Sequence, residues 1–152
     1  MAIKTHYFFK LTLPDTTEID ILAVYASSDD TPKFWEEAHT ILNTGKAKLR
    51  LMLGDYNCTL DHNRDDTRYK TDPHSKSRKI LNAMLDNEEL IDSYRHFHPD
   101  SCSYTYRNKK NNLRGRLDYG LISPSLIPST KKVNHIAHNY LLSDHANFSI
   151  TH

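Results

Sequence analysis

The sequence is poor in the residues that mark several specialised protein classes. Its 152 residues include two cysteines, Cys58 and Cys102, and one tryptophan. Two cysteines form neither a dense disulfide framework nor a paired metal-binding motif. The formal net charge is +1, so the chain as a whole does not attract nucleic acid, and any such binding must rest on local clusters of charge.

Long hydrophobic runs are also missing. No uninterrupted apolar run approaches the roughly 20 residues that span a bilayer, and nothing resembles a secretory signal. We therefore expect no membrane role, and we expect an intracellular location. The chain is long enough for one hydrophobic core but too short for two ordinary domains, so residues 1–152 are expected to form a single domain.

The first half of the chain alternates strand and helix patterns. His6–Leu13 and Glu18–Tyr25 are rich in aromatic and β-branched residues and flank a turn cluster, which predicts a β-hairpin. Thr31 with Pro32 predicts the start of a helix that ends near Gly45. Leu49–Leu53 is an apolar run stopped by Gly54, which is typical of a buried strand.

The second half contains a long polar segment and several short strands. Cys58–Ser75 predicts a long loop, and a helix follows with Ile80, Leu81, Met84 and Leu85 on one face. Further strands are expected at Tyr104–Tyr106, at Arg116–Ile122 and on both sides of Ser143–His145. This order favours an α+β or layered α/β fold.

Three short segments each place an acid at a strand end. They are Gly54-Asp55-Tyr56-Asn57, Arg116-Leu117-Asp118-Tyr119 and Ser143-Asp144-His145. Taken singly, each consists of residues that are ordinary in turns, so a plain strand end explains any one of them. Their shared chemistry and their order make the set informative.

In this order, the three segments resemble the motifs of the endonuclease/exonuclease/phosphatase superfamily. Leu90–Arg95, followed by His98-Pro99 and Tyr104–Tyr106, is similar to the connecting region of LINE-type (non-LTR) retrotransposon endonucleases, and Leu22–Ala26 is similar to another strand of the family. The resemblance implies a DNase I-like α/β (α+β) fold, a layered β-sandwich flanked by helices.

The resemblance also implies an activity. Members of the family hydrolyse phosphodiesters with a hard divalent cation, usually Mg²⁺, with Mn²⁺ as the alternative. Such ions prefer oxygen ligands, which suits Asp and Asn. The implied substrate is DNA, nicked in the nucleus if it is chromosomal, and the implied partner is a reverse transcriptase of the same element.

Carried over by motif, the resemblance gives each residue a role. Asp55 would orient or deprotonate the attacking water, and Asn57 would hold the phosphate or that water. Asp144 would lie near the metal, with Asp55 and Asn57 as further possible ligands. His145 would contact the phosphate, with Asp118 accepting from its other ring nitrogen.

Some of these assignments have plain alternatives. The family role of Tyr25 would direct its hydroxyl toward the phosphate, but a half-buried strand aromatic is an equal interpretation. Asp118 could simply pair with Arg116. Lys109, Lys110 and Arg114 form the basic cluster of the chain and could contact DNA phosphates, whereas a solvated hairpin turn is the default interpretation.

The pattern departs from the family at its beginning. A complete member starts with a strand that carries an Asn and a strand that carries a metal-binding Glu, and the first motif matched here surrounds Tyr25. The chain is therefore expected to be the carboxyl-terminal two-thirds of the domain and to bind its metal weakly. Three functions remain open: a nicking endonuclease, a phosphatase or lipid phosphodiesterase on the same fold, and a truncated, inactive remnant.

Overall fold

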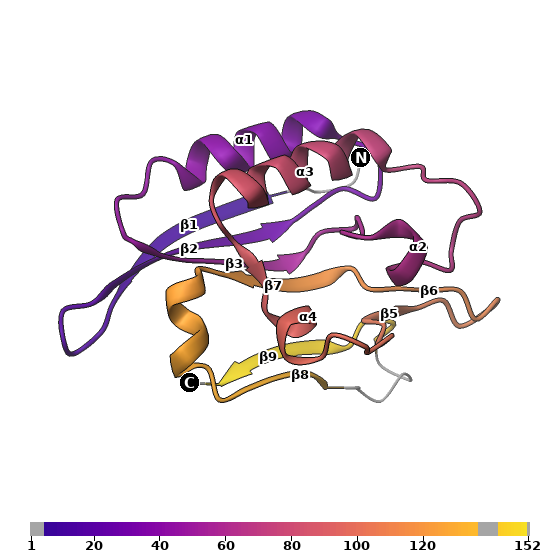
Figure 1. Ribbon diagram of the computed structural model, residues 1–152. Coiled ribbons are helices and arrows are strands. Elements are labelled where there is room, and N and C mark those ends of the chain that lie inside the picture. The colour runs from indigo at the N-terminus through magenta and orange to yellow at the C-terminus, as the bar shows by residue number, and fades with distance from the viewer. Residues whose placement is uncertain (1–4, 137–142, 152) are drawn as a thin grey trace.

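A β-hairpin opens the described part of the chain, which comprises residues 5–136 and 143–151 of a computed structural model (Figure 1). β1 (Thr5–Thr12) and β2 (Glu18–Tyr25) pair antiparallel. In the turn between them the Asp15 carboxylate accepts a hydrogen bond from the Thr17 amide at 3.0 Å, a contact typical of Asp in turns. The predicted hairpin is confirmed.

The chain then alternates helices and short strands. The helical elements are α1 (Pro32–Leu42), α2 (His62–Asp65), α3 (Ser75–Asn87), α4 (Ser93–Phe97) and the 3₁₀ helix η1 (Pro124–Ser129). The other strands are β3 (Leu49–Asp55), β4 (Ile91–Asp92), β5 (Tyr106–Arg107), β6 (Arg114–Gly115), β7 (Asp118–Ile122), β8 (Lys132–Ile136) and β9 (Asn147–Thr151). None of the helices in the described ranges is long and apolar enough to cross a membrane.

Five strands form the main sheet in the order β1-β2-β3-β7-β4. β2 and β3 lie parallel, as the helical connection through α1 permits, and β7 runs antiparallel to β3. In this register Tyr25 is opposite Asp55, and Asp55 is opposite Asp118. The carboxyl ends of β2 and β3 and the start of β7 therefore meet at one edge of the sheet.

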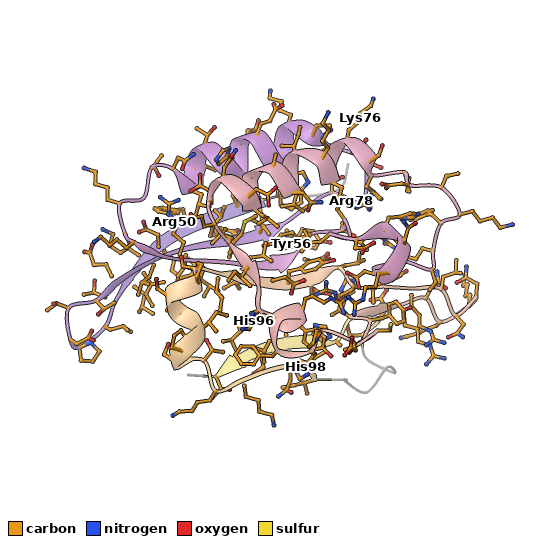
Figure 2. All side chains as sticks on the ribbon, viewed as in Figure 1. Arg50, Tyr56, Lys76, Arg78, His96 and His98 are labelled. Carbon is orange, nitrogen blue, oxygen red and sulfur yellow. The ribbon has the colours of Figure 1, made fainter. Side chains whose placement is uncertain are left out.

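The sheet has different cover on its two faces. α1 and α3 pack side by side over one face (Figure 1), and Figure 2 shows Tyr56 in the interior on this side, among core residues that include Trp35 and Met52. The β8–β9 ribbon and η1 cover part of the other face, where Leu126 and Ile150 belong to a second apolar cluster (Figure 1). A Cβ on Gly120 would lie 2.2 Å from the Phe148 ring, so glycine lets β9 approach β7 closely. The layered α/β prediction is confirmed.

A buried ion network ties the loops to the sheet. Arg116 is 2% exposed, and its Nη2 lies 2.7 Å from carboxylate oxygens of both Asp65 and Asp92. Arg95 donates to the other oxygen of Asp65 at 2.6 Å, and the Arg116 guanidinium lies 4.6 Å from the Tyr119 ring centroid. Because unpaired buried charge is costly, these contacts lock α2 and α4 to the start of β7.

Several predicted bounds are wrong. The strand expected at Tyr104–Tyr106 is the two-residue β5, Tyr106–Arg107, the strand expected from Arg116 begins at Asp118, and the long loop contains the short helix α2. The strand expected just before Ser143 falls on residues 137–142, which lie outside the described residues.

Candidate active site

Asp55 ends β3 at a point where only glycine can precede it. Gly54 has a φ of +134°, and a Cβ there would lie 2.0 Å from the carbonyl oxygen of Val24 on the neighbouring strand. Glycine alone tolerates this backbone and this approach. The Asp55 carboxylate then accepts a hydrogen bond from the Asn57 amide at 2.8 Å, which closes the turn after the strand.

Asn57 occupies that turn in a left-handed conformation, with a φ of +47°. Asn adopts this conformation more readily than most residues. Its Nδ2 donates to the carbonyl of Ala26 at 2.8 Å and lies 3.4 Å from the Asp55 carboxylate. This orientation leaves the amide oxygen as the ligand that Asn57 can offer. Behind the turn, Arg78 of α3 donates to the hydroxyl of Thr59 at 2.8 Å and anchors the segment (Figure 2).

Asp118 and His145 meet beside Asp55 although 27 residues separate them in the chain. His145 Nδ1 donates to Asp118 Oδ2 at 2.9 Å, and His145 Nε2 lies 3.8 Å from Asp55 Oδ2. Arg116 is not the partner of Asp118, because its guanidinium pairs with Asp65 and Asp92 instead. The two acids therefore approach different nitrogens of one imidazole ring.

Burial sets the protonation of this group. The pKa of Asp55 is raised from 3.8 to about 6, first because burial penalises the charged form and second because Asp118 carries a like charge nearby. The pKa of His145 is raised above 6.5, chiefly because its ring donates a hydrogen bond to Asp118. At neutral pH the site thus holds a basic carboxylate next to an imidazole that retains its proton readily.

The donor set suits a hard cation. Asp55, Asp118 and His145 offer ligand atoms that all lie within 4.8 Å of one another, the one such cluster among the described residues. Burial and the charge of Asp118 make the ionised form of Asp55 unfavourable, and a divalent cation nearby would offset that cost. Carboxylate and amide oxygens are the ligands that Mg²⁺ prefers. Asp144 is exposed and lies outside this cluster.

Tyr25 stands at the same edge of the sheet. It is the last residue of β2, lies opposite Asp55 in the parallel register and is 48% exposed. The structure therefore brings its strand position next to Asp55, and its side chain is open to solvent.

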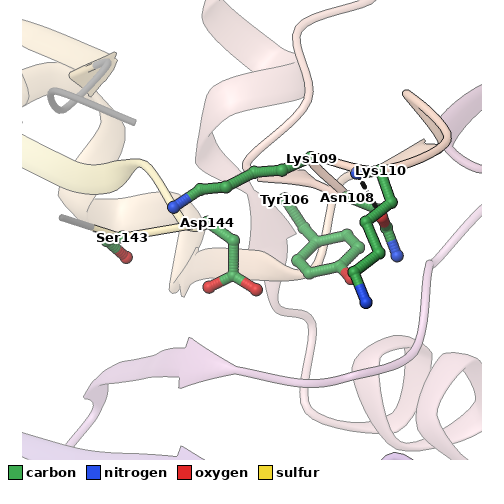
Figure 3. A pocket seen from close by; sticks show the side chains of 6 residues that line it. All are labelled: Tyr106, Asn108, Lys109, Lys110, Ser143 and Asp144. Carbon is green, nitrogen blue, oxygen red and sulfur yellow. Dashed lines mark hydrogen bonds between the residues drawn. The ribbon is translucent and has the colours of Figure 1, made fainter. Parts of the chain in front are cut away.

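Two of the three predicted DNA-binding residues lie close to Asp144. Lys109 and Lys110 line a hollow of about 470 Å³ together with Tyr106, Asn108, Ser143 and Asp144 (Figure 3). The third, Arg114, faces elsewhere, with its guanidinium 5.8 Å from the Tyr104 ring centroid. The lysines thus lie beside the segment Ser143–His145. Arg114 lines a separate hollow with Tyr104.

Tyr106 and Arg68 also belong to this region, and sequence reasoning missed them. The Tyr106 ring lies 5.2 Å from the His145 ring. Arg68 is held by two hydrogen bonds to Asp66, at 3.0 and 2.8 Å, and lines a hollow of about 240 Å³ with Asn57 and Tyr106. The aromatic run around Thr105 was a signal for Tyr106, whereas nothing local in the sequence marks Arg68.

No protein-family model matches the sequence. Solved structures do match it. An AP endonuclease from Archaeoglobus fulgidus superposes with a TM-score of 0.78 at 17% identity, over 95% of this chain and 64% of that one. A 3′-5′ exonuclease from Neisseria meningitidis gives 0.71 at 23% identity, over 96% and 70%.

A third structure, a 3′ phosphatase from Neisseria bound to a product DNA hairpin, gives a TM-score of 0.65 at 22% identity, over 97% of this chain and 72% of that one. The chain thus spans about two-thirds of the length of these structures. Similarity at this identity establishes a shared fold, the DNase I-like arrangement of a mixed sheet with flanking helices.

Proposed function

We propose that this chain hydrolyses DNA phosphodiester bonds with a divalent metal ion, as a nicking endonuclease domain of a LINE-type retrotransposon. The observation that carries the proposal is the cluster of Asp55, Asp118 and His145 at one edge of the sheet. A carboxylate and an imidazole held by a second carboxylate suit acid–base chemistry on a phosphate.

Asp55 is the base in this proposal. With a pKa of about 6 it is mostly ionised at neutral pH yet still basic enough to take a proton from water. Asn57 shares the same turn and would hold the water or a phosphate oxygen. A bound Mg²⁺ or Mn²⁺ would neutralise phosphate charge, and Asn57 and Asp144 are the oxygen donors that would hold it beside Asp55.

In this proposal His145 donates a hydrogen bond to the phosphate. Its Nδ1–H is engaged by Asp118, and the raised pKa favours the doubly protonated ring, in which Nε2–H also donates. That second N–H lies on the Asp55 side of the ring. A negatively charged oxygen placed there would accept from His145, as in other sites that stabilise developing charge. The Tyr25 hydroxyl, at the same sheet edge, would add a second donor.

The choice of DNA as substrate rests on charge and on similarity. Lys109 and Lys110 line the hollow beside Asp144, where a nucleic-acid backbone would meet positive charge. One of the matching structures holds a DNA hairpin. The retrotransposon origin, and with it a reverse transcriptase as partner, rests on the resemblance of Leu90–Arg95 and the segment after it.

Nicking of supercoiled plasmid tests the proposal. We expect Mg²⁺-dependent nicking that EDTA abolishes, and we expect Asp55→Asn and His145→Ala to lower the rate by roughly 100-fold or more. His39→Ala is a matched control, because His39 also pairs with a carboxylate, at 2.7 Å, and is 31% exposed against 29% for His145. It should nick at the wild-type rate.

The substrate panel separates the remaining functions. Cleavage of a 3′-phosphorylated or abasic oligonucleotide without plasmid nicking would assign a repair-type activity instead, and turnover of a phosphorylated lipid headgroup alone would assign the lipid phosphodiesterase. Folded protein that turns over no substrate in either metal would refute the catalytic proposal and leave an inactive protein of the same fold.

A further inference from the structure

Thr105 is a buried residue that contacts the backbone on both sides of the Asp118–His145 pair. It is 1% exposed. Its hydroxyl oxygen accepts hydrogen bonds from two successive amides, those of Leu117 at 2.8 Å and Asp118 at 3.0 Å. Its own carbonyl accepts from the Ala146 amide at 2.6 Å. One side of Thr105 thus holds the start of β7, and the other holds the segment that carries His145.

The surrounding contacts extend this junction. Tyr106 forms an antiparallel bridge with His145, and the Arg107 amide donates to the Asp144 carbonyl at 2.9 Å. On the far side, the Leu117 carbonyl accepts from the Tyr56 amide at 2.8 Å. The peptide before Asp118 is therefore held at its carbonyl by the segment after Asp55 and at its amide by Thr105.

The threonine hydroxyl is the part of this junction that a side chain supplies. Two adjacent amides aimed at one point need an acceptor there, because a buried N–H without a partner is costly. A carbonyl of a neighbouring strand cannot serve both amides in a regular ladder. The hydroxyl oxygen, with two lone pairs, accepts from both.

We propose that Thr105 is a positioning residue that keeps the Asp118 carboxylate within hydrogen-bonding distance of His145. Thr105 touches no reacting group, and it acts through the backbone of Asp118 and Ala146. The inference rests on the proposed function only in that catalysis is one of its two readouts. Loss of the acceptor releases the Asp118 amide, and a small displacement of a catalytic group lowers turnover steeply.

Three variants separate positioning from a general cost of altering a buried threonine. Thr105→Val keeps the shape and removes the acceptor, and Thr105→Ser keeps the acceptor. Thr130→Val is the matched control, since Thr130 is 6% exposed, donates its hydroxyl to the Leu126 carbonyl at 2.8 Å and lies beyond the other end of β7.

The kinetic expectation is specific. Thr105→Val should lower kcat for plasmid nicking by roughly 10- to 100-fold, with KM for DNA unchanged, whereas Thr105→Ser and Thr130→Val should keep the wild-type kcat. All assays are run at least 15 °C below the measured Tm of each variant. Should Thr105→Val not fold, Thr105→Cys takes its place, because a thiol is a weak acceptor.

The second readout needs no activity. In ¹⁵N-selective NMR of the metal-free protein at fixed pH, the hydrogen-bonded Nδ1–H of His145, assigned with His145→Ala, should be present in wild type, Thr105→Ser and Thr130→Val and lost in Thr105→Val. If wild type cleaves nothing but the signal follows this pattern, the proposed function fails and the positioning role stands. Wild-type kcat in Thr105→Val, or an unchanged His145 signal, overturns the inference.

Discussion

Asp55→Asn should stabilise the protein at neutral pH in the absence of metal while abolishing the proposed hydrolysis. Burial and the nearby Asp118 raise the Asp55 pKa from 3.8 to about 6. The folded state therefore favours the protonated carboxyl, and the ionised form at pH 7.5 costs about 3 kcal/mol, since each pKa unit corresponds to about 1.4 kcal/mol. Asparagine fills the same space, can still accept from the Asn57 amide and carries no charge.

The sign of the pH dependence follows from the raised pKa. The favourable contribution of protonated Asp55 is fully present below pH 3.8 and is lost as pH rises through about 6. The stability advantage of Asp55→Asn should therefore be about 3 kcal/mol at pH 7.5 and only about 1.5 kcal/mol at pH 5. Urea denaturation in EDTA at the two pH values measures both differences.

Two comparisons make the result decisive. Asp144→Asn changes an exposed acid of the same region and should alter the free energy of unfolding by less than about 0.5 kcal/mol. Added Mg²⁺ should stabilise wild type more than Asp55→Asn, since a ligand stabilises the state that binds it. A destabilised Asp55→Asn at pH 7.5, or an advantage that does not shrink toward pH 5, would refute the assignment of Asp55 as a partly buried acid with a raised pKa.

Two further predictions test the frame around the site. Gly54→Ala should lower the free energy of unfolding by about 3 kcal/mol or more, because its Cβ would lie 2.0 Å from the Val24 carbonyl oxygen; urea denaturation measures this. The pKa of His135 is lowered from 6.5 to about 4, first by burial and then by Arg116. The stability that the neutral His135 ring contributes is therefore present above pH 6.5 and lost as pH falls toward 4. His135→Phe should therefore lose about 2 kcal/mol less stability than wild type between pH 7 and pH 4.5, measured by the same method.

Local patterns predicted the elements whose determinants lie within a few residues. The hairpin followed from alternation around a turn cluster, and β2 has its predicted bounds, Glu18–Tyr25. The helix after Thr31 begins at Pro32 as predicted, although the Thr31 side chain makes no capping hydrogen bond. Proline at the first turn supplies the start there, because its fixed φ already suits a helix.

The failures occur where distant segments decide the local structure. Tyr104 and Thr105 have strand-like side chains, yet the regular strand is only Tyr106–Arg107, and the Thr105 hydroxyl accepts from the amides of Leu117 and Asp118, which lie far along the chain. α2 begins at a side-chain cap, in which Asp61 accepts from the Arg64 amide at 3.2 Å, and its Asp65 is fixed by Arg116 from far along the chain. The Asp61 cap is a local signal that the prediction of a loop passed over, whereas the ion pair of Asp65 with Arg116 has no signature in a short window of sequence.

For the site, the motifs named Asp55, Asp118 and His145, and the resemblance gave Asp118 as the acceptor for a His145 ring nitrogen, as the structure has it, but neither showed what brings the three together. Asp55, Asp118 and His145 come together because β3 and β7 pair in one register and because Thr105 links β7 to the segment before β9. The position of Arg68 depends on Asp66, which itself forms a bridge with Gly115. Such contacts follow only from the folded arrangement of several strands.

Three acids of this protein, Asp55, Asp65 and Asp66, differ in how their charge is balanced. Asp65 and Asp66 each have an arginine within 2.8 Å, so their charges are satisfied and their role is to hold loops. Asp55 instead faces an imidazole at 3.8 Å and a second acid, and its pKa rises. Such a group costs stability when it is ionised, and it suits a site that takes up a proton or a cation.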